Sequence, residues 1–256
     1  MSVRLRVHIS PVGYEVKRVT EPLVKLQADR VYLITYQEDD NAKDFVEAVK
    51  LELKTKYSHI VVKEAYVDMW DPYACIAKFR EIIELERANH VFVNVSTGTK
   101  VTAMAGMLAC MLWDASPYYV KVSYPPSQKK IILPSERIDD VYSIPVYDIN
   151  KPRDEYLAVL EIIRSAGGKL KKSKLIAALE KLKLIEKKDE NTADFTQSAK
   201  HSQLRAILDP MDREWNYVAV ESSGRRSEVV ITEQGKKALA IFGVPSKYRE
   251  GFYLSP

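Results

Sequence analysis

The sequence predicts an α/β protein: a Rossmann-like, mostly parallel sheet followed by a winged helix-turn-helix domain. In the first half of the chain, stretches with strand character alternate with amphipathic helical stretches, which is typical of a parallel sheet with helices on both faces. The second half changes to three helical stretches, a hairpin and a closing helix, which is the element order of a winged helix. A length of 256 residues accommodates two such domains.

The elements of the first domain follow one another in the order βαβαβαβα. The strand that starts at Val91 is rich in β-branched and aromatic residues, as expected of a strand covered on both faces. Pro72 fits the first turn of the helix before it. The other strands are expected at residues 3–9, 30–36 and 60–67, helices at residues 17–26 and 42–57, and an edge hairpin at residues 118–124 and 129–133. We expect this domain to span residues 1–135 and a polar, proline-containing linker to span residues 136–152.

The second domain is expected to span residues 153–245, with a C-terminal tail at residues 246–256. Its first helix is predicted to end at a Gly-Gly-Lys sequence, and Ser173 is predicted to cap the second helix. The first, third and closing helices are expected at residues 154–165, 197–208 and 233–242, and the wing hairpin turns at residues 222–226.

Charge is distributed unevenly between the two halves. Residues 1–150 carry 19 Lys and Arg against 20 Asp and Glu, whereas residues 151–256 carry 20 against 15. The basic second half suits a nucleic-acid-binding module, although the lysine-rich surface of a thermophilic protein would look similar. There is no signal-peptide pattern and no apolar run of the ~18 residues that a membrane span needs, so we expect a cytoplasmic protein that does not contact membrane.

A Ser/Thr/Gly turn between the fourth strand and the following helix is the strongest candidate for a binding site. It consists of Ser96, Thr97, Gly98, Thr99 and Lys100. The free N–H groups and partial positive charge of a helix N-terminus attract anions, and hydroxyls and a Lys add donors, so the turn is predicted to hold phosphate. The alternative is that Ser96 or Thr99 only caps the helix and that Lys100 is a solvated surface charge.

A second turn is predicted at the same edge of the sheet. Ser10, Pro11, Val12 and Gly13 end the first strand. Because the carboxyl ends of parallel strands meet at one edge, we expect the two turns to form one pocket. His8 lies inside the first strand, where a hydrogen-bonded core histidine is more common than a general base.

The sequence offers few other patterns that carry chemistry. Asp68 ends a strand at the same edge and is expected either to cap the next helix or to belong to the site. With only Cys75 and Cys110, we expect neither a disulfide framework nor a cysteine-based zinc site, and we predict no metal or cofactor. The absence of the GxGxxG, P-loop, HExxH and GxSxG patterns argues against dinucleotide oxidoreductases, P-loop NTPases, metalloproteases and α/β-hydrolases.

The third helix of the second domain is expected to enter the major groove of DNA. Its polar residues can bond phosphates or base edges; they are Gln197, Lys200, His201, Gln203 and Arg205. Further basic residues lie at the wing and at the start of the second helix; they are Arg225, Arg226, Lys171, Lys172 and Lys174. Contacts of this kind with the phosphate backbone supply affinity that does not depend on sequence. The alternative is a winged helix used only for dimerisation.

Two segments carry a resemblance to a known family. HISPVGYEVKRVTEPL, which contains the first turn, and VFVNVSTGTKVTAMAG, which contains the second, resemble segments of CARF (CRISPR-associated Rossmann fold) domains. With the winged helix that follows, the resemblance covers nearly the whole chain. It is closest to archaeal CARF and winged-helix transcriptional regulators, both the Csa3-like group and related proteins outside CRISPR loci.

The resemblance implies a ligand-responsive regulator of transcription. It implies a homodimer whose CARF domains share a symmetric pocket for a cyclic oligoadenylate, most often the four-nucleotide ring, with double-stranded DNA bound by the winged helix. Because some CARF domains cleave their ligand without metal, Ser10, Lys100 and His8 are candidate catalytic residues. Thr97 stands where many members have glycine, which supports a third reading in which the CARF domain serves only to dimerise.

Overall fold

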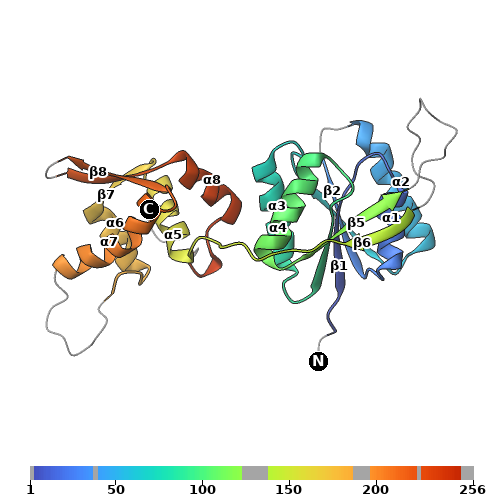
Figure 1. The fold of residues 1–256 in the computed structure, drawn as a ribbon, viewed down its shortest axis with the longest axis horizontal. Helices are drawn as coiled ribbons and strands as arrows, with labels where there is room; N and C mark the ends of the chain where they lie inside the picture. Colours follow the sequence, from blue (N-terminus) through green and yellow to red (C-terminus); the bar gives the residue numbers. More distant parts are fainter. Residues whose placement is uncertain (1–2, 37–39, 123–137, 187–196, 224–225, 249–256) are drawn as a thin grey trace. The chain divides into compact units, whose positions relative to one another are not determined.

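The computed structural model divides into two compact units, Met1–Asn150 and Lys151–Pro256 (Figure 1). The structure describes residues 3–36, 40–122, 138–186, 197–223 and 226–248. Within these ranges, no helix combines the length and the apolar character that crossing a membrane requires.

The first unit is built on a six-stranded sheet with the order β3-β2-β1-β4-β5-β6. Its strands are β1 (Arg6–Pro11), β2 (Arg30–Thr35), β3 (Val61–Tyr66), β4 (His90–Asn94), β5 (Ser116–Val122) and β6 (Ile138–Ser143). Its helices are α1 (Lys17–Lys25), α2 (Asp40–Lys56), α3 (Pro72–Leu85) and α4 (Lys100–Trp113). Helices α1 and α2 cover one face of the sheet and α3 and α4 the other (Figure 1). The predicted Rossmann-like fold is confirmed.

The strand order reverses between β1 and β4. Strand β1 continues through α1 to β2, its parallel neighbour on one side, whereas β4 continues through α4 to β5 on the other side. The loops that follow β1 and β4 therefore leave the same edge of the sheet in opposite directions. Ligands of open α/β sheets bind at such a switch point, outside the carboxyl ends of the strands.

The centre of the sheet is apolar and tightly packed. Val7 and Ile9 of β1 pair in register with Val91 and Val93 of β4, and each of the four is at most 5% exposed. Gly106 lets α4 lie close to this sheet, because a Cβ there would be 3.1 Å from Val93 Cγ1. The site at the end of β1 and β4 thus stands on a rigid base.

Strand β6 corrects the predicted end of the first domain. Residues 138–143, which the sequence indicates as linker, pair antiparallel with β5. Their polar composition resembles a linker because β6 is an edge strand, with half of its backbone groups and much of its surface open to solvent. The predicted second strand of the hairpin, residues 129–133, lies outside the described residues.

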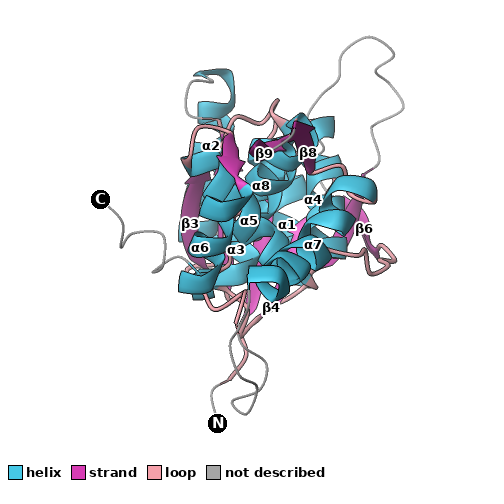
Figure 2. Ribbon diagram, turned by 90° about the vertical axis from the view of Figure 1, so that its left-hand side faces the viewer, coloured by secondary structure: helices cyan, strands magenta, loops and turns pink. Residues whose placement is uncertain are grey.

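The second unit has the element order of a winged helix, as predicted. Its elements are α5 (Asp154–Ser165), β7 (Lys169–Lys171), α6 (Lys172–Lys181), α7 (Gln197–Arg213), β8 (Val218–Ser223), β9 (Arg226–Ile231) and α8 (Glu233–Phe242). Strands β8 and β9 lie side by side as an antiparallel wing (Figure 2), and β7 pairs with β9. Strand β7 was not predicted, because three residues are too few to show an alternating pattern.

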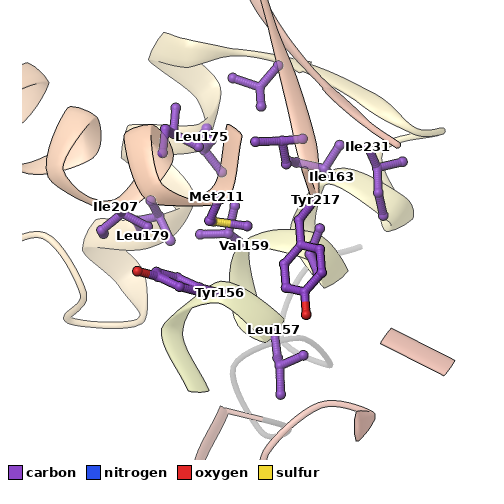
Figure 3. Packing of buried hydrophobic residues seen from close by; sticks show 14 of the residues in the cluster. Tyr156, Leu157, Val159, Ile163, Leu175, Leu179, Ile207, Met211, Tyr217 and Ile231 are labelled. Carbon is purple, nitrogen blue, oxygen red and sulfur yellow. The ribbon is translucent and has the colours of Figure 1, made fainter. Parts of the chain in front are cut away.

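The core of this unit joins its three helices to the hairpin. Figure 3 shows side chains from α5, α6, α7 and the strands gathered in one apolar cluster. Met211 is 0% exposed within this cluster, which explains why α7 continues through Pro210 instead of ending at the predicted residue 208. Helix α6 begins at Lys172 with no side-chain cap, so the predicted capping role of Ser173 is wrong.

Candidate functional site

The two predicted turns are in direct contact. A Cβ on Gly13, after β1, would lie 3.1 Å from the backbone nitrogen of Gly98, after β4. Gly98 has a φ of +78°, and a Cβ there would lie 2.6 Å from Pro11 Cβ and 2.6 Å from Thr102 Oγ1. Only glycine fits position 98, because a side chain would meet both an unfavourable backbone conformation and the neighbouring turn. The fold therefore brings both turns into one site at the switch point.

The first turn of α4 supplies the polar groups of this site. Thr99 is the N-cap: its Oγ1 accepts a hydrogen bond from Thr102 N at 3.1 Å and donates one to Met69 O at 2.9 Å. Gly98 and Lys100, on either side of it, are exposed, and the first turn contains no acidic residue. The remaining N–H groups and the Lys100 ammonium form a positively polarised surface that is open to an anion.

The two other hydroxyls of this turn differ in their use. Ser96 Oγ accepts a hydrogen bond from Val120 N at 3.0 Å and donates one to Asn94, so it joins the ends of β4 and β5. Thr97 is 6% exposed, and its Oγ1 has no hydrogen-bond partner among the described residues. A buried hydroxyl without a partner is costly and marks a place where a water or ligand completes the hydrogen bonding. Because Thr97 is buried, its side chain leaves the Gly98 backbone open.

Pro11 and Val12 determine the path of the first turn. Val12 is 2% exposed, and its backbone N–H donates to Ile34 O at 2.8 Å. Pro11 is buried and lies next to Gly98. Both residues therefore hold the backbone of Gly13 against the second turn, and a ligand at this turn meets backbone atoms more than side chains.

His8 lies in the core below the site. It is 0% exposed, its Nδ1 is 3.3 Å from the Tyr118 hydroxyl, and its ring stacks on Phe92 with centroids 5.0 Å apart. Burial, the largest cause, and the nearby charge of Arg6 together lower the pKa of His8 to about 3, against the opposing effect of Asp29. The imidazole is therefore neutral near pH 7 and out of reach of a ligand at the turns.

Ser10 is equally inaccessible. It is 0% exposed, and its Oγ makes no hydrogen bond of good geometry with another described residue. It lies beside the Tyr118 phenol, whose pKa is raised by burial. Of the three residues considered for ligand cleavage, only Lys100 is exposed. Of these three residues, Lys100 thus gives a binding group at the surface of the turn, and neither buried residue is placed to act as a base beside it.

Two residues that the sequence analysis missed fix this edge of the sheet. Asn94 Nδ2 donates to Arg18 O at 2.9 Å, and Asn94 Oδ1 accepts from Ser96 N at 3.0 Å. An Arg18 guanidinium nitrogen donates to Val120 O at 3.1 Å. The start of α1 and the ends of β4 and β5 are thereby tied together. A single amide in the apolar run VFVNV is the signal that could have identified Asn94.

Asp68 does not cap the helix that follows it. Its carboxylate accepts from Trp70 N at 2.9 Å and closes a tight turn. The cap of α3 is Asp71, which accepts from the backbone nitrogens of Tyr73 and Ala74. The cap lies three residues later than predicted because the turn intervenes between β3 and α3.

A second candidate surface lies on α7. Three of its predicted DNA contacts are exposed: Gln197, His201 and Arg205. Arg205 pairs with Asp209 at 3.5 Å, and the other two predicted contacts also have partners on the protein. Gln203 exchanges hydrogen bonds of 3.0 and 3.2 Å with the backbone of Glu186, and Lys200 forms an ion pair with Glu180 of α6. The exposed face of α7 is therefore polar, and the positive charges on it are partly neutralised by acidic partners.

The start of α6 is more basic than α7. Lys171 and Lys174 are exposed and Lys172 is half-buried. None of the three forms an ion pair with another described residue. Arg225 and the side chain of Arg226 lie outside the described part of the chain, so their predicted place at the wing tip stays a prediction.

The fold and these two surfaces define a Rossmann-like α/β domain with a glycine-lined candidate anion site, followed by a winged-helix domain. Two family models match the two parts. Residues 6–124 match the model described as HFX_2341_N-like, N-terminal. Residues 155–243 match the DUF6293 C-terminal winged helix domain. Each match falls within one of the two structural units.

Two archaeal proteins are similar in sequence. The uncharacterized protein MJ1513 of Methanocaldococcus jannaschii is 27% identical over 197 residues, which is 65% of this chain and 58% of that protein. An uncharacterized protein of Archaeoglobus fulgidus is 24% identical over 160 residues, which is 62% of this chain and 63% of that protein. The aligned part of the chain thus spans less than two thirds of the length of either relative.

Two solved structures are similar at a coarse level. Enterococcus italicus Csm6, bound to cyclic hexa-2'-fluoro-hexa-dAMP, aligns with a TM-score of 0.42 at 16% identity, over 82% of this chain and 56% of that chain. Can2 from Sulfobacillus thermosulfidooxidans, in complex with cyclic tetra-adenylate, aligns with a TM-score of 0.36 at 16% identity, over 93% of this chain and 64% of that chain.

Proposed function

We propose that this protein is a DNA-binding transcriptional regulator whose CARF-like domain binds a cyclic oligoadenylate, with the four-nucleotide ring as the preferred ligand. The observation that carries the proposal is the contact between Gly13 and Gly98 at the switch point, beside the N-terminus of α4. Backbone N–H groups that side chains do not cover suit the phosphates of a nucleotide. The CARF resemblance of the same two turns favours a cyclic oligoadenylate among nucleotides.

We propose that the functional form is a homodimer and that α4 contributes to its interface. Helix α4 carries one charged residue, Lys100, in its 14 residues. One side of it packs on the sheet and α3, but Met104 and Leu108 remain 61% and 41% exposed. With the half-buried Val101 and Met111 they repeat at the three- and four-residue spacing of a helix interface. A second copy across this stripe would bring two α4 N-termini to one shared ligand.

We propose that the second unit binds DNA, because its helices and strands follow the order of a winged helix and its basic residues are concentrated at the start of α6. In this arrangement α7 lies in the major groove and the lysines at the start of α6 contact the phosphate backbone. The ligand controls DNA affinity only if it binds two arrangements of the dimer with different affinity, since equal binding shifts no population.

A titration of DNA with the full-length protein tests this proposal. We expect the affinity for double-stranded DNA, measured by fluorescence anisotropy, to change at saturating cyclic tetra-adenylate. Lys100→Ala should weaken ligand binding, whereas Lys54→Ala, which removes an exposed lysine of α2, should not. Unchanged DNA affinity at saturating ligand contradicts a ligand-responsive regulator. Chromatography of the same samples separates intact ring from linear product, and turnover would assign the site to a ring nuclease instead.

A further inference from the structure

Two exposed aromatic residues directly follow residues that lie at the contact between Gly13 and Gly98. Trp70 is 69% exposed and Tyr14 is 58% exposed. Tyr14 directly follows Gly13 in the β1–α1 loop, and Trp70 belongs to the β3–α3 loop.

The backbone next to Trp70 is fixed against the α4 turn. Met69 is 5% exposed; its carbonyl accepts from Thr99 Oγ1 at 2.9 Å, and its Cε would lie 3.0 Å from a Cβ on Gly98. The Asp68 carboxylate holds the backbone N–H of Trp70 at 2.9 Å. The loop is therefore locked to the candidate anion site at the residue before Trp70, while the indole itself remains largely in solvent.

Among the described residues, Tyr14 has a ring contact with α2. Its ring meets Phe45 of α2 edge-on, with centroids 5.5 Å apart. More than half of Tyr14 remains exposed to solvent. One aromatic residue thus borders the site from each of two loops that the packing of Pro11, Gly98 and Met69 joins.

Large aromatic side chains left exposed beside an anion site have a specific use. Phosphate groups alone give no reason to keep an indole in water, because an indole has one N–H donor and no charge. A nucleobase has a flat π-face, and stacking on Trp or Tyr stabilises nucleotide binding without regard to base identity.

We propose that Trp70 is a stacking platform for a base of the bound ligand and that Tyr14 is a second platform. This inference rests on the proposed function and adds the residues that hold the bases of the ligand, which distinguish it from a phosphate or polyphosphate alone. Phosphate is held at the α4 turn, and a base extends from it over the indole. Trp70 is a binding residue in this scheme and takes no part in chemistry.

Calorimetric titration of the full-length protein with cyclic tetra-adenylate tests the proposal with three variants. Trp70→Ala is expected to weaken binding by tenfold or more, since stacking on one aromatic residue supports an effect of that order. Trp70→Phe keeps a π-face and should lose no more than about threefold. The matched control is Tyr147→Ala, which removes a side chain that is 76% exposed beyond β6. Because β6 is antiparallel, it leaves the sheet at the opposite edge, so this control should bind normally.

Tryptophan fluorescence provides the second readout. Stacking should quench the emission of the wild-type protein on ligand addition, and Trp70→Phe should lose this signal while it still binds. Circular dichroism melting of each variant shows whether it is folded. Wild-type affinity in a folded Trp70→Ala variant overturns this inference alone. Equal loss in Trp70→Ala and Trp70→Phe also overturns it, because an aromatic face would then be irrelevant. Absence of binding to the wild-type protein overturns the proposed ligand, and the inference with it.

Discussion

The two candidate surfaces of this protein are built from different materials. The site between β1 and β4 is made mainly of backbone that is held in place by packing. Gly98 can carry no side chain, and the backbone N–H of Val12 donates a hydrogen bond to β2. The surface on α6 and α7 is made of long side chains in solvent, and Lys200 already has an ion-pair partner. Shape therefore governs the first surface and net charge the second.

This difference predicts how each surface responds to change. Packing in the first unit makes ligand binding sensitive to single atoms, and with Lys100 as the one charged side chain of α4 its dependence on salt should be weaker than that of DNA binding. In the second unit, each charged residue adds its own contribution to the affinity for DNA. That affinity should therefore depend strongly on salt. Substitutions chosen for one property should therefore leave the other surface unaffected.

Gly98→Ala should give the largest effect. The new Cβ would lie 2.6 Å from Pro11 Cβ and would require a φ of +78° in a residue with a side chain. Strain and overpacking together should reduce the free energy of unfolding by about 2–4 kcal/mol. We expect ligand binding to be lost. Urea denaturation followed by circular dichroism, with calorimetry for the ligand, measures both.

Gly167→Ala is the matched control for this substitution. Gly167 has a φ of +86°, but no heavy atom lies within 4 Å of a Cβ placed there. It should therefore show the backbone strain alone, about 1–2 kcal/mol. If the two variants lose equal stability and Gly98→Ala still binds ligand, the close contact between the two turns is not what shapes the site.

The position of the glycine turn was predictable, whereas its tightness was not. Strand patterning and the Ser/Thr/Gly composition placed Ser96 to Lys100 at the carboxyl edge beside Ser10 to Gly13. Which hydroxyl is free depends on contacts between distant segments: Ser96 bonds to β5, 24 residues away, and Thr97 does not. Similarly, β6 reads as polar linker because an edge strand has no periodic apolar face to reveal it.

His8 should give the first unit a pH dependence of its own. The folded protein keeps His8 neutral down to about pH 3, whereas an unfolded histidine takes up a proton below its ordinary pKa of 6.5. The unfolded state therefore binds more protons in this range, and the free energy of unfolding falls with decreasing pH by up to about 1.4 kcal/mol per unit. Stability from this source is complete above pH 6.5 and is lost as the pH approaches 3.

His8→Phe should flatten that part of the stability profile, because phenylalanine can stack on Phe92 without titrating. The measurement is urea denaturation between pH 4 and 7. His59→Gln, which removes an exposed histidine, should keep the wild-type slope. A wild-type slope in His8→Phe would show that groups other than His8 cause the acid sensitivity.

Removing the lysines at the start of α6 should weaken DNA binding by the second unit. A Lys171→Ala, Lys172→Ala, Lys174→Ala variant loses three phosphate contacts, so the slope of log affinity against log salt should decrease by about 2.7. Affinity at ~0.1 M salt should fall by roughly tenfold or more. Ligand binding should not change, because the affected charges belong to the other unit.

Anisotropy titrations of DNA at several salt concentrations measure this effect. The control variant removes three exposed lysines of α2 in the first unit: Lys43, Lys54 and Lys56. It lowers the net charge of the protein equally. An equal loss of affinity in both variants would mean that total charge, and not the α6 surface, determines DNA binding.

Glu180→Gln should give the smallest effect. It tests whether the ion pair between Glu180 and Lys200 lowers the affinity of α7 for DNA. Glu180 neutralises Lys200, and both side chains are partly exposed, at 34% and 21%. Loss of the carboxylate should cost less than about 1 kcal/mol in stability, as for other exposed pairs. The Lys200 ammonium then has one acidic partner fewer, so DNA affinity should rise about two- to fivefold and the salt slope should steepen by up to about 0.9.

Glu233→Gln is the control: it removes a paired carboxylate from α8, where Lys236 is its partner. A comparable gain in both variants would mean that added positive charge anywhere on the unit strengthens binding, and Lys200 would then have no special place on the DNA-binding face.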